Sequence, residues 1–561
     1  MPGNSVDVAL INGSVITVDD ANTIAEAVWI RDGRIAAVGS NAEVIERCGN
    51  TSQVDLQGNS VTPGFVDTHG HIALFGLDEL KVQLGGALSR RAILERIADA
   101  ARDAKPGDWL ITTPIGTGPY YLDFEALRGA GELPLAAELE RAAPHNPVYI
   151  TAPTNRVPNS AVLNYRALAA AGITADTPTA APIEIVLDAH GAMTGELRGA
   201  MQPLYNPHAF YERIANVIPP ATYADVREGI RRLAPQFAAG GTTTLLEAHL
   251  THPRELRAYT ELRESGDLPL RVFFTFEIDG RASVAEIERE LETLQFAAGN
   301  GFGDARLKVA GISAGLDGPY WHGAAVHDRA YPGPFGEPVE PTTLMPPATY
   351  REVVRLAVER GFRLHTECAG RGSIEMALAT LRDANAVQSI RDRRFIIEHC
   401  EFPTAAQIAM CAQLGVIPTT STNFIWGKGD EVYRERLGDA LAATAIPLRA
   451  WIDAGVPVCQ STDWGPRSAM FTLWQSLARH AGLSGQALGE AQRITREEAI
   501  RIFTLNGAYA LGMEREIGSI EIGKRADLAV LSADVLNCPL DALRDIDVML
   551  TLRDGEVIHA R

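Results

Sequence analysis

The stretch Val61-Thr-Pro-Gly-Phe-Val-Asp-Thr-His-Gly-His71 joins an apolar, β-prone run to a His-x-His pair. On an extended strand, residues i and i+2 point to the same face, so the imidazoles of His69 and His71 are expected to converge. Two neutral imidazoles that converge form half of a divalent-metal site, which needs further ligands from elsewhere in the chain. Taken alone, the pair is equally compatible with two surface histidines.

The middle of the chain alternates β-prone runs with helical patterns. Helices are expected between the runs, for example over 222–238, 283–298 and 348–360. This alternation favours a parallel (β/α)8 barrel, although a doubly wound sheet produces a similar pattern. The expected strands are 61–68, 243–248, 270–278, 305–311, 362–366, 394–399, 416–422 and 456–463.

Both ends of the chain have a different pattern, with short β-prone runs separated by turns such as Asp32-Gly33 and Asp554-Gly555. We therefore expect residues 1–60 and 512–561 to build one β-sandwich domain together. Residues 61–76 and 222–511 then form the catalytic barrel. The 77–221 segment is too long for a structureless loop, so it is interpreted as a subdomain inserted after the first barrel strand, over the barrel mouth.

Four further polar residues lie at or near the ends of predicted strands: Lys308, His365, His399 and Asp463. Active sites of barrels are built at the carboxyl ends of the strands, so these side chains are expected on the same rim as the His-x-His pair. Each has an ordinary explanation when taken singly. A lone histidine is commonly a core residue, Lys308 is typical of a snorkelling lysine, and Asp463 is typical of a turn. Together they favour a metal centre.

Composition restricts the class of protein. The formal charge of −19 over 561 residues disfavours nucleic-acid and anionic-membrane partners. Six cysteines without CxxC spacing are typical of reduced thiols, and neither a signal peptide nor a membrane-length apolar run is evident. We therefore expect a cytoplasmic, soluble protein. For an enzyme of this size with a small-molecule substrate, a homo-oligomer is the default expectation.

Several motifs resemble the amidohydrolase superfamily. They are Pro63-Gly-Phe-Val-Asp-Thr-His-Gly-His71, Ser461-Thr-Asp463 and the tail from Gly518 to Leu531, together with the paired His365 and His399. The chain is most similar to the amidohydrolase-3 (YtcJ-like) branch, which includes N-substituted formamide deformylases. The resemblance covers nearly the whole chain and implies a metal-dependent (β/α)8 barrel with a β-sandwich from both termini.

The resemblance also implies ligand roles. His69, His71 and Asp463 match the ligands of one divalent ion, most commonly zinc, and His365 with His399 match those of a second. Lys308 matches the lysine that is modified to N6-carboxylysine and bridges the two ions; a carbamate offers oxygen ligands that an ammonium lacks. The chain departs from the branch after His365, where Thr-Glu-Cys-Ala-Gly-Arg371 stands, so the substrate is not specified.

These features predict hydrolysis of a non-peptide C–N bond, such as an amide, formamide or cyclic amide. A metal-activated hydroxide attacks the carbonyl and Asp463 acts as proton shuttle. The alternatives are a metal-dependent decarboxylase or isomerase on the same scaffold, and a non-catalytic binding protein. His249 and Glu367 are further residues of the cleft that are not expected to bind the metal directly. Glu367 lies beside His365, and neighbouring residues of a strand face opposite ways. For His249 and His252 a surface position is the preferred interpretation. Candidate substrate-binding residues are Glu247, Tyr320, His322 and Trp426.

Overall fold

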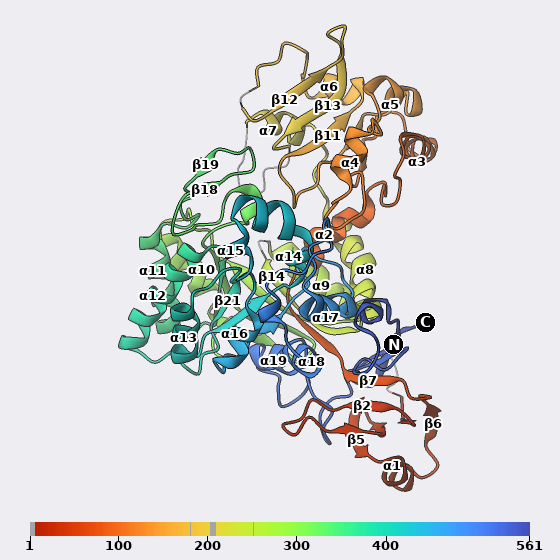
Figure 1. Cartoon of the computed structure of the whole chain (residues 1–561), viewed down its shortest axis with the longest axis vertical. Coiled ribbons are helices and arrows are strands. Elements are labelled where there is room, and N and C mark those ends of the chain that lie inside the picture. The colour runs from red at the N-terminus through yellow and green to blue at the C-terminus, as the bar shows by residue number, and fades with distance from the viewer. Residues whose placement is uncertain (1–5, 180, 202–208, 251) are drawn as a thin grey trace.

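The computed structural model describes residues 6–179, 181–201, 209–250 and 252–561, and its centre is a sheet of parallel strands (Figure 1). Neighbouring strands in this sheet follow one another in chain order, as in a barrel and unlike a doubly wound sheet. The eight strands are β8 (Phe65–Gly70), β14 (Thr242–Leu250), β15 (Arg271–Glu277), β17 (Leu307–Gly315), β20 (Leu364–Cys368), β21 (Ile396–His399), β22 (Ile417–Thr420) and β23 (Cys459–Gln460). The predicted (β/α)8 barrel is therefore confirmed.

The first and last strands of the barrel are joined at their carboxyl ends. The amide of Asp463 donates to the carbonyl oxygen of His69 at 3.1 Å. The hydroxyl of Thr68 donates to the carbonyl oxygen of Gln460 at 3.0 Å. These bonds connect β8 to β23 and to the loop that follows it, so the two edges of the nearly closed sheet are joined.

Helices between the strands surround the sheet (Figure 1). These helices begin and end at typical capping residues. Thr404 and Gln407 form a capping box at the start of α13 (Ala405–Leu414). Gly415 ends the same helix with a left-handed backbone conformation. The main covering helices are α8 (Tyr223–Ala239), α9 (Pro253–Ser265), α10 (Val284–Thr293), α11 (Pro347–Arg360), α12 (Arg371–Val387), α13, α16 (Leu448–Asp453), α17 (Ala469–Ala478), α18 (Arg496–Ile502) and α19 (Leu505–Ala510).

Both ends of the chain combine into two further sheets, at the bottom of Figure 1. The predicted strand 61–68 is in fact two strands, because β7 (Ser60–Pro63) pairs in the second of these sheets and the barrel strand starts at Phe65. Gly64 lies at the change of sheet, where a Cβ atom would approach the Thr243 side chain to 2.3 Å. The sheet orders are β5-β4-β1-β6 and β26-β25-β24-β7-β2-β3. Their remaining strands are β1 (Val8–Ile11), β2 (Ser14–Ile16), β3 (Ile24–Ala25), β4 (Ala27–Arg31), β5 (Arg34–Gly39), β6 (Ser52–Asp55), β24 (Leu528–Leu531), β25 (Val548–Arg553) and β26 (Glu556–Ala560).

The long segment between β8 and β14 carries its own five-stranded sheet, at the top of Figure 1. It contacts the barrel through η4 (Gly429–Arg436), whose Arg436 donates to the carbonyl oxygen of Val157 at 2.9 Å. Arg156 also pairs with Glu431. Its elements include α3 (Arg90–Asp103), β9 (Leu110–Thr112), β10 (Val148–Ile150), β11 (Asn159–Leu163), β12 (Glu184–Leu187) and β13 (Met193–Gly199).

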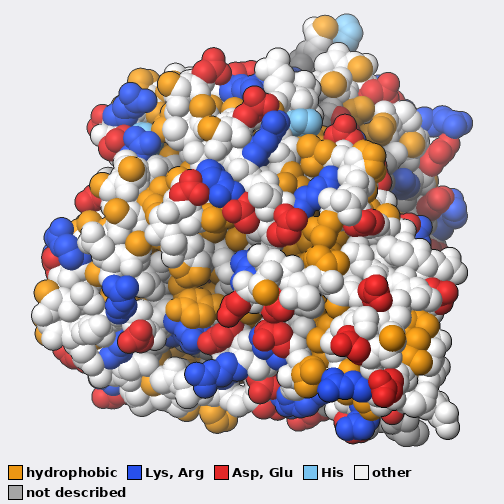
Figure 2. Space-filling model, turned by 60° about the horizontal axis from the view of Figure 1, so that its bottom comes forward, with side chains coloured by type: hydrophobic (Ala, Val, Ile, Leu, Met, Phe, Trp, Pro, Cys, Tyr) orange, Lys and Arg blue, Asp and Glu red, His pale blue; other side chains and the backbone are white. Residues whose placement is uncertain are grey.

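Acidic and basic side chains are interspersed over the face drawn in Figure 2. A continuous basic surface, which nucleic-acid binding requires, is not present on that face. Within the described residues, no helix combines the length and the apolar character needed to cross a bilayer.

A buried ion cluster joins the barrel to the terminal sheets. Arg271, at the start of β15, is 0% exposed, and its guanidinium lies 3.1 Å from Asp527 and 3.0 Å from Asp554. Both aspartates belong to the C-terminal segment that contributes β24, β25 and β26 to the terminal sheets. Removing one partner of a buried pair leaves a charge without compensation, which is much costlier than losing a surface pair.

Asp527→Ala should therefore lower the free energy of unfolding by about 3–5 kcal/mol, measured as a lower melting temperature by scanning calorimetry. The matched control is Asp279→Ala, which removes an exposed carboxylate paired with Arg281 at 3.5 Å and should change the melting temperature little. Equal shifts for the two variants would contradict a special role for the buried cluster.

Candidate metal centre

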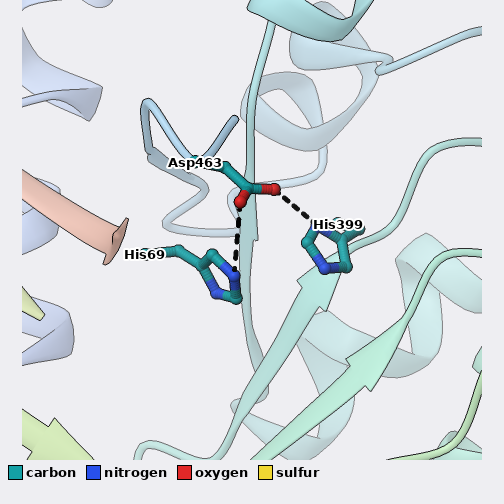
Figure 3. A group of neighbouring side chains, drawn as sticks. All are labelled: His69, His399 and Asp463. Atoms are coloured by element: carbon teal, nitrogen blue, oxygen red, sulfur yellow. Dashed lines mark ion pairs between the residues drawn. The ribbon is translucent and has the colours of Figure 1, made fainter. Parts of the chain in front are cut away.

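Three residues from distant parts of the sequence meet at the carboxyl end of the barrel (Figure 3). His69 lies near the end of β8, His399 is the last residue of β21, and Asp463 follows β23. His71 stands just after β8 and caps α2 (Ile72–Gly76). Barrel topology thus brings together the two histidines of the His-x-His pair, His399 and Asp463.

The Asp463 carboxylate lies between the imidazoles (Figure 3). Its Oδ1 is 3.3 Å from Nε2 of His71 and 3.8 Å from Nε2 of His69, and its Oδ2 is 3.6 Å from Nδ1 of His399. Both oxygens are buried, and neither has a hydrogen-bond partner among the described residues. The atoms are therefore close without being hydrogen-bonded to one another.

The carboxylates and imidazoles of the site shift one another's pKa values. Burial alone would raise the pKa of Asp463, but the imidazoles of His69, His71 and His399 hold it well below its usual range. Burial would lower the pKa of His399, yet the carboxylates of Glu367 and Asp463 raise it to about 9. Asp463 is consequently ionised at neutral pH, and the surroundings favour a bound cation.

Two buried carboxylates position the His-x-His pair. Asp67 accepts from the amides of His69 (3.3 Å) and Thr462 (3.2 Å), so it ties β8 to the loop that carries Asp463. Glu247 accepts from the amides of Ile72 and Ala73, at 2.8 and 3.2 Å, and thereby holds the start of α2 directly after His71. None of these four hydrogen bonds involves a substrate, so both carboxylates belong to the framework of the site.

Backbone strain is concentrated at the same strand ends. His249, His399, Cys400 and Asp463 all have positive φ, at 57°, 67°, 47° and 47°. This left-handed conformation is unfavourable for residues other than glycine, and it persists where the surrounding structure and a function require it. At His399 it also breaks the alternation of the strand, so the adjacent side chains of Glu398 and His399 both reach the site.

Lys308 is a correction to the sequence prediction. The fourth strand was expected over 305–311 with Lys308 near its end, but β17 runs from Leu307 to Gly315, so Lys308 is its second residue. Ser313, five residues further on, pairs in register with His365 and Glu277, which separates Lys308 from the level of the site by roughly 16 Å. Its Nζ instead lies 5.9 Å from the centre of the Phe273 ring.

His365 lies in β20, fully buried, with Nδ1 3.6 Å from Oε1 of Glu398. Glu398, which the sequence interpretation did not include, lies near the metal centre, and His249 lies there too. His249 was expected at the surface, but β14 extends to Leu250 and brings this ring to 2.9 Å from Glu398 and 2.6 Å from Glu277. His252 instead precedes α9.

Glu367 was expected in the cleft without direct contact to the metal. Because it stands two residues after His365 on β20, it shares the face of His365, and its Oε1 lies 3.7 Å from Nε2 of His399. The alternation of the strand therefore places Glu367 at the site, next to His399.

A cavity beside the centre is lined by Asp463, His399 and Glu367 together with aromatic and polar side chains. The insertion supplies part of this lining, and a larger cavity of about 770 Å³ meets it at Thr154, Asp463 and Trp464. The aromatic lining residues are Tyr120, Trp321, Phe424 and Trp464, and the polar ones include Thr154, Asn155, His322, Glu401 and Lys428.

The four candidate substrate-binding residues have different surroundings. His322 lines the cavity, and its Nε2 donates to the carbonyl oxygen of Thr154 at 2.7 Å; burial lowers its pKa to about 4, so the ring is neutral. Glu247 holds α2, as described above. Tyr320 hydrogen-bonds His327 at 2.9 Å, and Trp426 packs with its ring centre 5.7 Å from that of Trp474. These last three do not line this cavity.

The donors fit a divalent cation. Imidazole nitrogens and carboxylate oxygens are the ligands of zinc and related ions, and bonds of about 2.0–2.2 Å in a tetrahedral site separate the donor atoms by roughly 3.3–3.6 Å. The separations of 3.3 and 3.6 Å around Asp463 match this spacing, and 3.8 Å is slightly longer. The buried oxygens of Asp463, which make no hydrogen bond within the described residues, supply the negative charge that a cation requires.

A sequence profile described as the amidohydrolase family matches residues 53–559. N-substituted formamide deformylase of Arthrobacter pascens is 27% identical, with 99% of this chain and 98% of that protein covered. The putative amidohydrolase YtcJ of Bacillus subtilis is 24% identical over 98% of both chains. The crystal structure of an uncharacterized metal-dependent hydrolase from Pyrococcus horikoshii superposes with a TM-score of 0.70 at 22% identity, covering 95% of this chain and 99% of that one.

Zn²⁺ added to chelator-treated protein should raise its melting temperature, because an ion that binds only the folded state stabilises it. A free ion at 100 times its dissociation constant contributes about 2.7 kcal/mol. Differential scanning fluorimetry measures the shift. Mg²⁺ at the same concentration is the control, since it prefers oxygen ligands and octahedral geometry. An equal shift with Mg²⁺, or none with Zn²⁺, would contradict the assignment of a histidine-rich metal centre.

Proposed function

The chain belongs to the amidohydrolase family and is a metal-dependent hydrolase, and we propose that it cleaves a non-peptide carbon–nitrogen bond of a small molecule. An amide, a formamide or a cyclic amide is the expected substrate class. The observation that carries this proposal is the buried, ionised Asp463 carboxylate between His69, His71 and His399 at the edge of a cavity. The relative named N-substituted formamide deformylase supports the same bond type.

The proposed metal is zinc, held by His69, His71, His399 and Asp463. A divalent ion bound there supplies Lewis-acid polarisation of a carbonyl and lowers the pKa of water. Histidine-rich donor sets with one carboxylate are typical of catalytic zinc. A cytoplasmic location and a homo-oligomeric state stay predictions.

Asp463 has the properties of a proton shuttle. It lines the cavity, so it is accessible to a substrate, and the neighbouring imidazoles that lower its pKa keep it ionised, as a proton acceptor must be. In the proposed reaction its carboxylate takes the proton from the attacking water and gives it to the leaving nitrogen. The Asp67 bond to the amide of Thr462 holds the loop that presents this carboxylate.

The cavity favours a substrate with an apolar, planar group. The rings of Tyr120, Trp321 and Phe424 are largely buried and line the cavity from the insertion and the barrel. On the polar side, Lys428 lies 2.5 Å from Glu401 and its Nζ lies 3.7 Å from the centre of the Phe424 ring. Aromatic walls with a few polar groups are typical of small-molecule pockets.

A decarboxylase or isomerase on this scaffold is the second candidate, and a non-catalytic binding protein is the third. A panel of N-aryl and N-alkyl amides and aromatic carboxylic acids separates them. Release of amine supports the proposal, and release of carbon dioxide without amine supports a decarboxylase. Metal-loaded protein that turns over nothing in the panel would argue against the proposed hydrolysis.

Asp463→Asn should reduce kcat for amide hydrolysis by about 10²- to 10⁴-fold, the usual contribution of a general acid–base group. The amide keeps an oxygen donor, so we expect metal content by mass spectrometry to be retained. Asp453→Asn is the control, because that carboxylate is 62% exposed and pairs only with Arg449 among the described residues. Unchanged turnover in Asp463→Asn would refute the shuttle role.

Among formamides, an N-phenyl substrate should be preferred over the N-methyl analogue. Burying about 80 Å² more apolar surface contributes about 2 kcal/mol, which corresponds to about thirtyfold in kcat/KM. Phe424→Ala should reduce this preference, because it removes part of the aromatic wall. Steady-state kinetics on both substrates measure the ratio, and a preference for the N-methyl compound would contradict an apolar pocket.

A further inference from the structure

Lys428 is a charged residue in the wall of the cavity, and the proposed reaction does not use it. It is the last residue of α14 (Asn423–Lys428), and its side chain is 7% exposed. Its Nζ lies 3.7 Å from the centre of the Phe424 ring, and the centre of that ring lies 5.8 Å from the centre of the His399 imidazole. The Phe424 ring thus adjoins both the ammonium and a proposed metal ligand.

The buried carboxylate of Glu401 holds this ammonium in place. Its Oε1 accepts from Nζ of Lys428 at 2.5 Å, and its Oε2 accepts from the hydroxyl of Tyr433 at 2.6 Å. An ammonium has three N–H donors, and within the described residues Glu401 is the one hydrogen-bond acceptor of Lys428. Lys428 also begins η4, which is a π-helix, a rare conformation that is frequent at functional sites. The ammonium is therefore oriented while keeping donors for a ligand.

Two more donors of the same wall lack an acceptor. The hydroxyl of Tyr120 and Nε1 of Trp321 are buried and make no hydrogen bond within the described part of the chain. Both residues line the cavity, and their rings meet edge to face with centres 6.0 Å apart. The Tyr120 ring packs on Gly427, where a Cβ atom would approach it to 2.4 Å, so it adjoins the residue before Lys428. Because an indole N–H can only donate, this wall offers an excess of donors and calls for an acceptor.

The charges around the cavity favour an acceptor without charge. Glu401 already compensates the ammonium of Lys428, so the pair has no net charge to offer an anion. The carboxylates of Glu367 and Asp463 line the same cavity. A carboxylate on the ligand would add a like charge, which is costly where it is not compensated. A carbonyl, ether or nitro oxygen accepts hydrogen bonds without that cost.

We propose that Lys428 recognises an uncharged oxygen acceptor on the aromatic group of the substrate, with Tyr120 and Trp321 as additional donors. The aromatic group lies along Phe424, with the scissile amide at the metal centre and the acceptor at Lys428. Lys428 is then a residue that determines specificity and takes no part in bond cleavage. This inference rests on the proposed hydrolysis, and it narrows the substrate to aryl amides with an oxygen acceptor at the far end of the ring.

A purely structural role for the Lys428–Glu401 pair is the alternative. The pair joins α14 to the residue that follows Cys400 at the end of β21, and a bond of this kind stabilises the barrel without contact to a ligand. A structural pair would not distinguish two ligands of the same shape. Discrimination between such ligands therefore separates the two roles.

Isothermal titration calorimetry on the zinc-loaded protein compares 4-aminoacetophenone with 4-isopropylaniline, which has nearly the same shape and lacks the oxygen acceptor. We expect the wild type to bind the acetyl compound about tenfold more tightly, the usual contribution of a hydrogen bond from a charged donor. Lys428→Met should remove most of this preference. Lys308→Met is the matched control, because its ammonium also lies near a phenylalanine ring, 5.9 Å from the centre of Phe273, and is remote from the cavity. That variant should keep the preference.

Tyr120→Phe is a second variant, which removes a hydroxyl without a hydrogen-bond partner in the described residues. It should lower the preference about threefold, and it carries the test if Lys428→Met fails to fold by circular dichroism. No preference in the wild type overturns the inference, and so does a preference that both variants keep. Tighter binding of 4-aminobenzoate than of 4-aminoacetophenone contradicts an uncharged acceptor.

Kinetics on the two corresponding formamides distinguish this inference from the proposed function. The ratio of their kcat/KM values is compared between the wild type and Lys428→Met, which cancels the difference in their intrinsic reactivity. Hydrolysis with the same ratio in both proteins contradicts the role of Lys428 alone. A binding preference that Lys428→Met removes, without hydrolysis of either formamide, contradicts the proposed function alone.

Discussion

The hydrogen bond from the amide of Asp463 to the carbonyl oxygen of His69 joins the two ends of the barrel sheet. It connects residues nearly 400 positions apart in the sequence, and both residues are proposed ligands of the metal ion. Asp67 reinforces this junction by accepting from the amides of His69 and Thr462. Closing the barrel and assembling the metal centre are therefore one structural event, and a barrel that failed to close would also separate its ligands.

Two features of the metal centre, its buried carboxylates and its left-handed backbone conformations, lower the stability of the fold. Carboxylates without lysine or arginine partners are buried at the strand ends, and His249, His399, Cys400 and Asp463 have left-handed backbone conformations. Each such conformation costs of order 1–3 kcal/mol. The surrounding barrel, with its closed sheet and covering helices, supplies the compensation. Strain and excess negative charge at the same strand ends are what a preorganised cation site requires.

The sequence predicted the eight barrel strands, the insertion and the convergence of His69, His71, His399 and Asp463, because each ligand follows a strongly apolar run. The prediction was wrong where a residue's position depended on the exact end of a strand. A shift of the fourth strand by a few residues moved Lys308 from the rim to the opposite end of β17. Glu398 could not be found from alternation, since the positive φ of His399 turns two adjacent side chains toward one site. A surface position was preferred for His249, but β14 extends past the predicted boundary and carries this residue to the site.

The segment inserted after β8 contributes to the substrate cavity, so substrate specificity can change through this segment alone. Tyr120, Thr154 and Asn155 of this segment line the cavity, whereas every proposed metal ligand lies on the barrel strands or directly after them. Recognition and chemistry thus occupy different stretches of the chain. Replacing the insertion with that of a relative is an engineering route to new substrates that leaves the catalytic ligands untouched, provided that the contacts of Arg156 and Arg436 are kept.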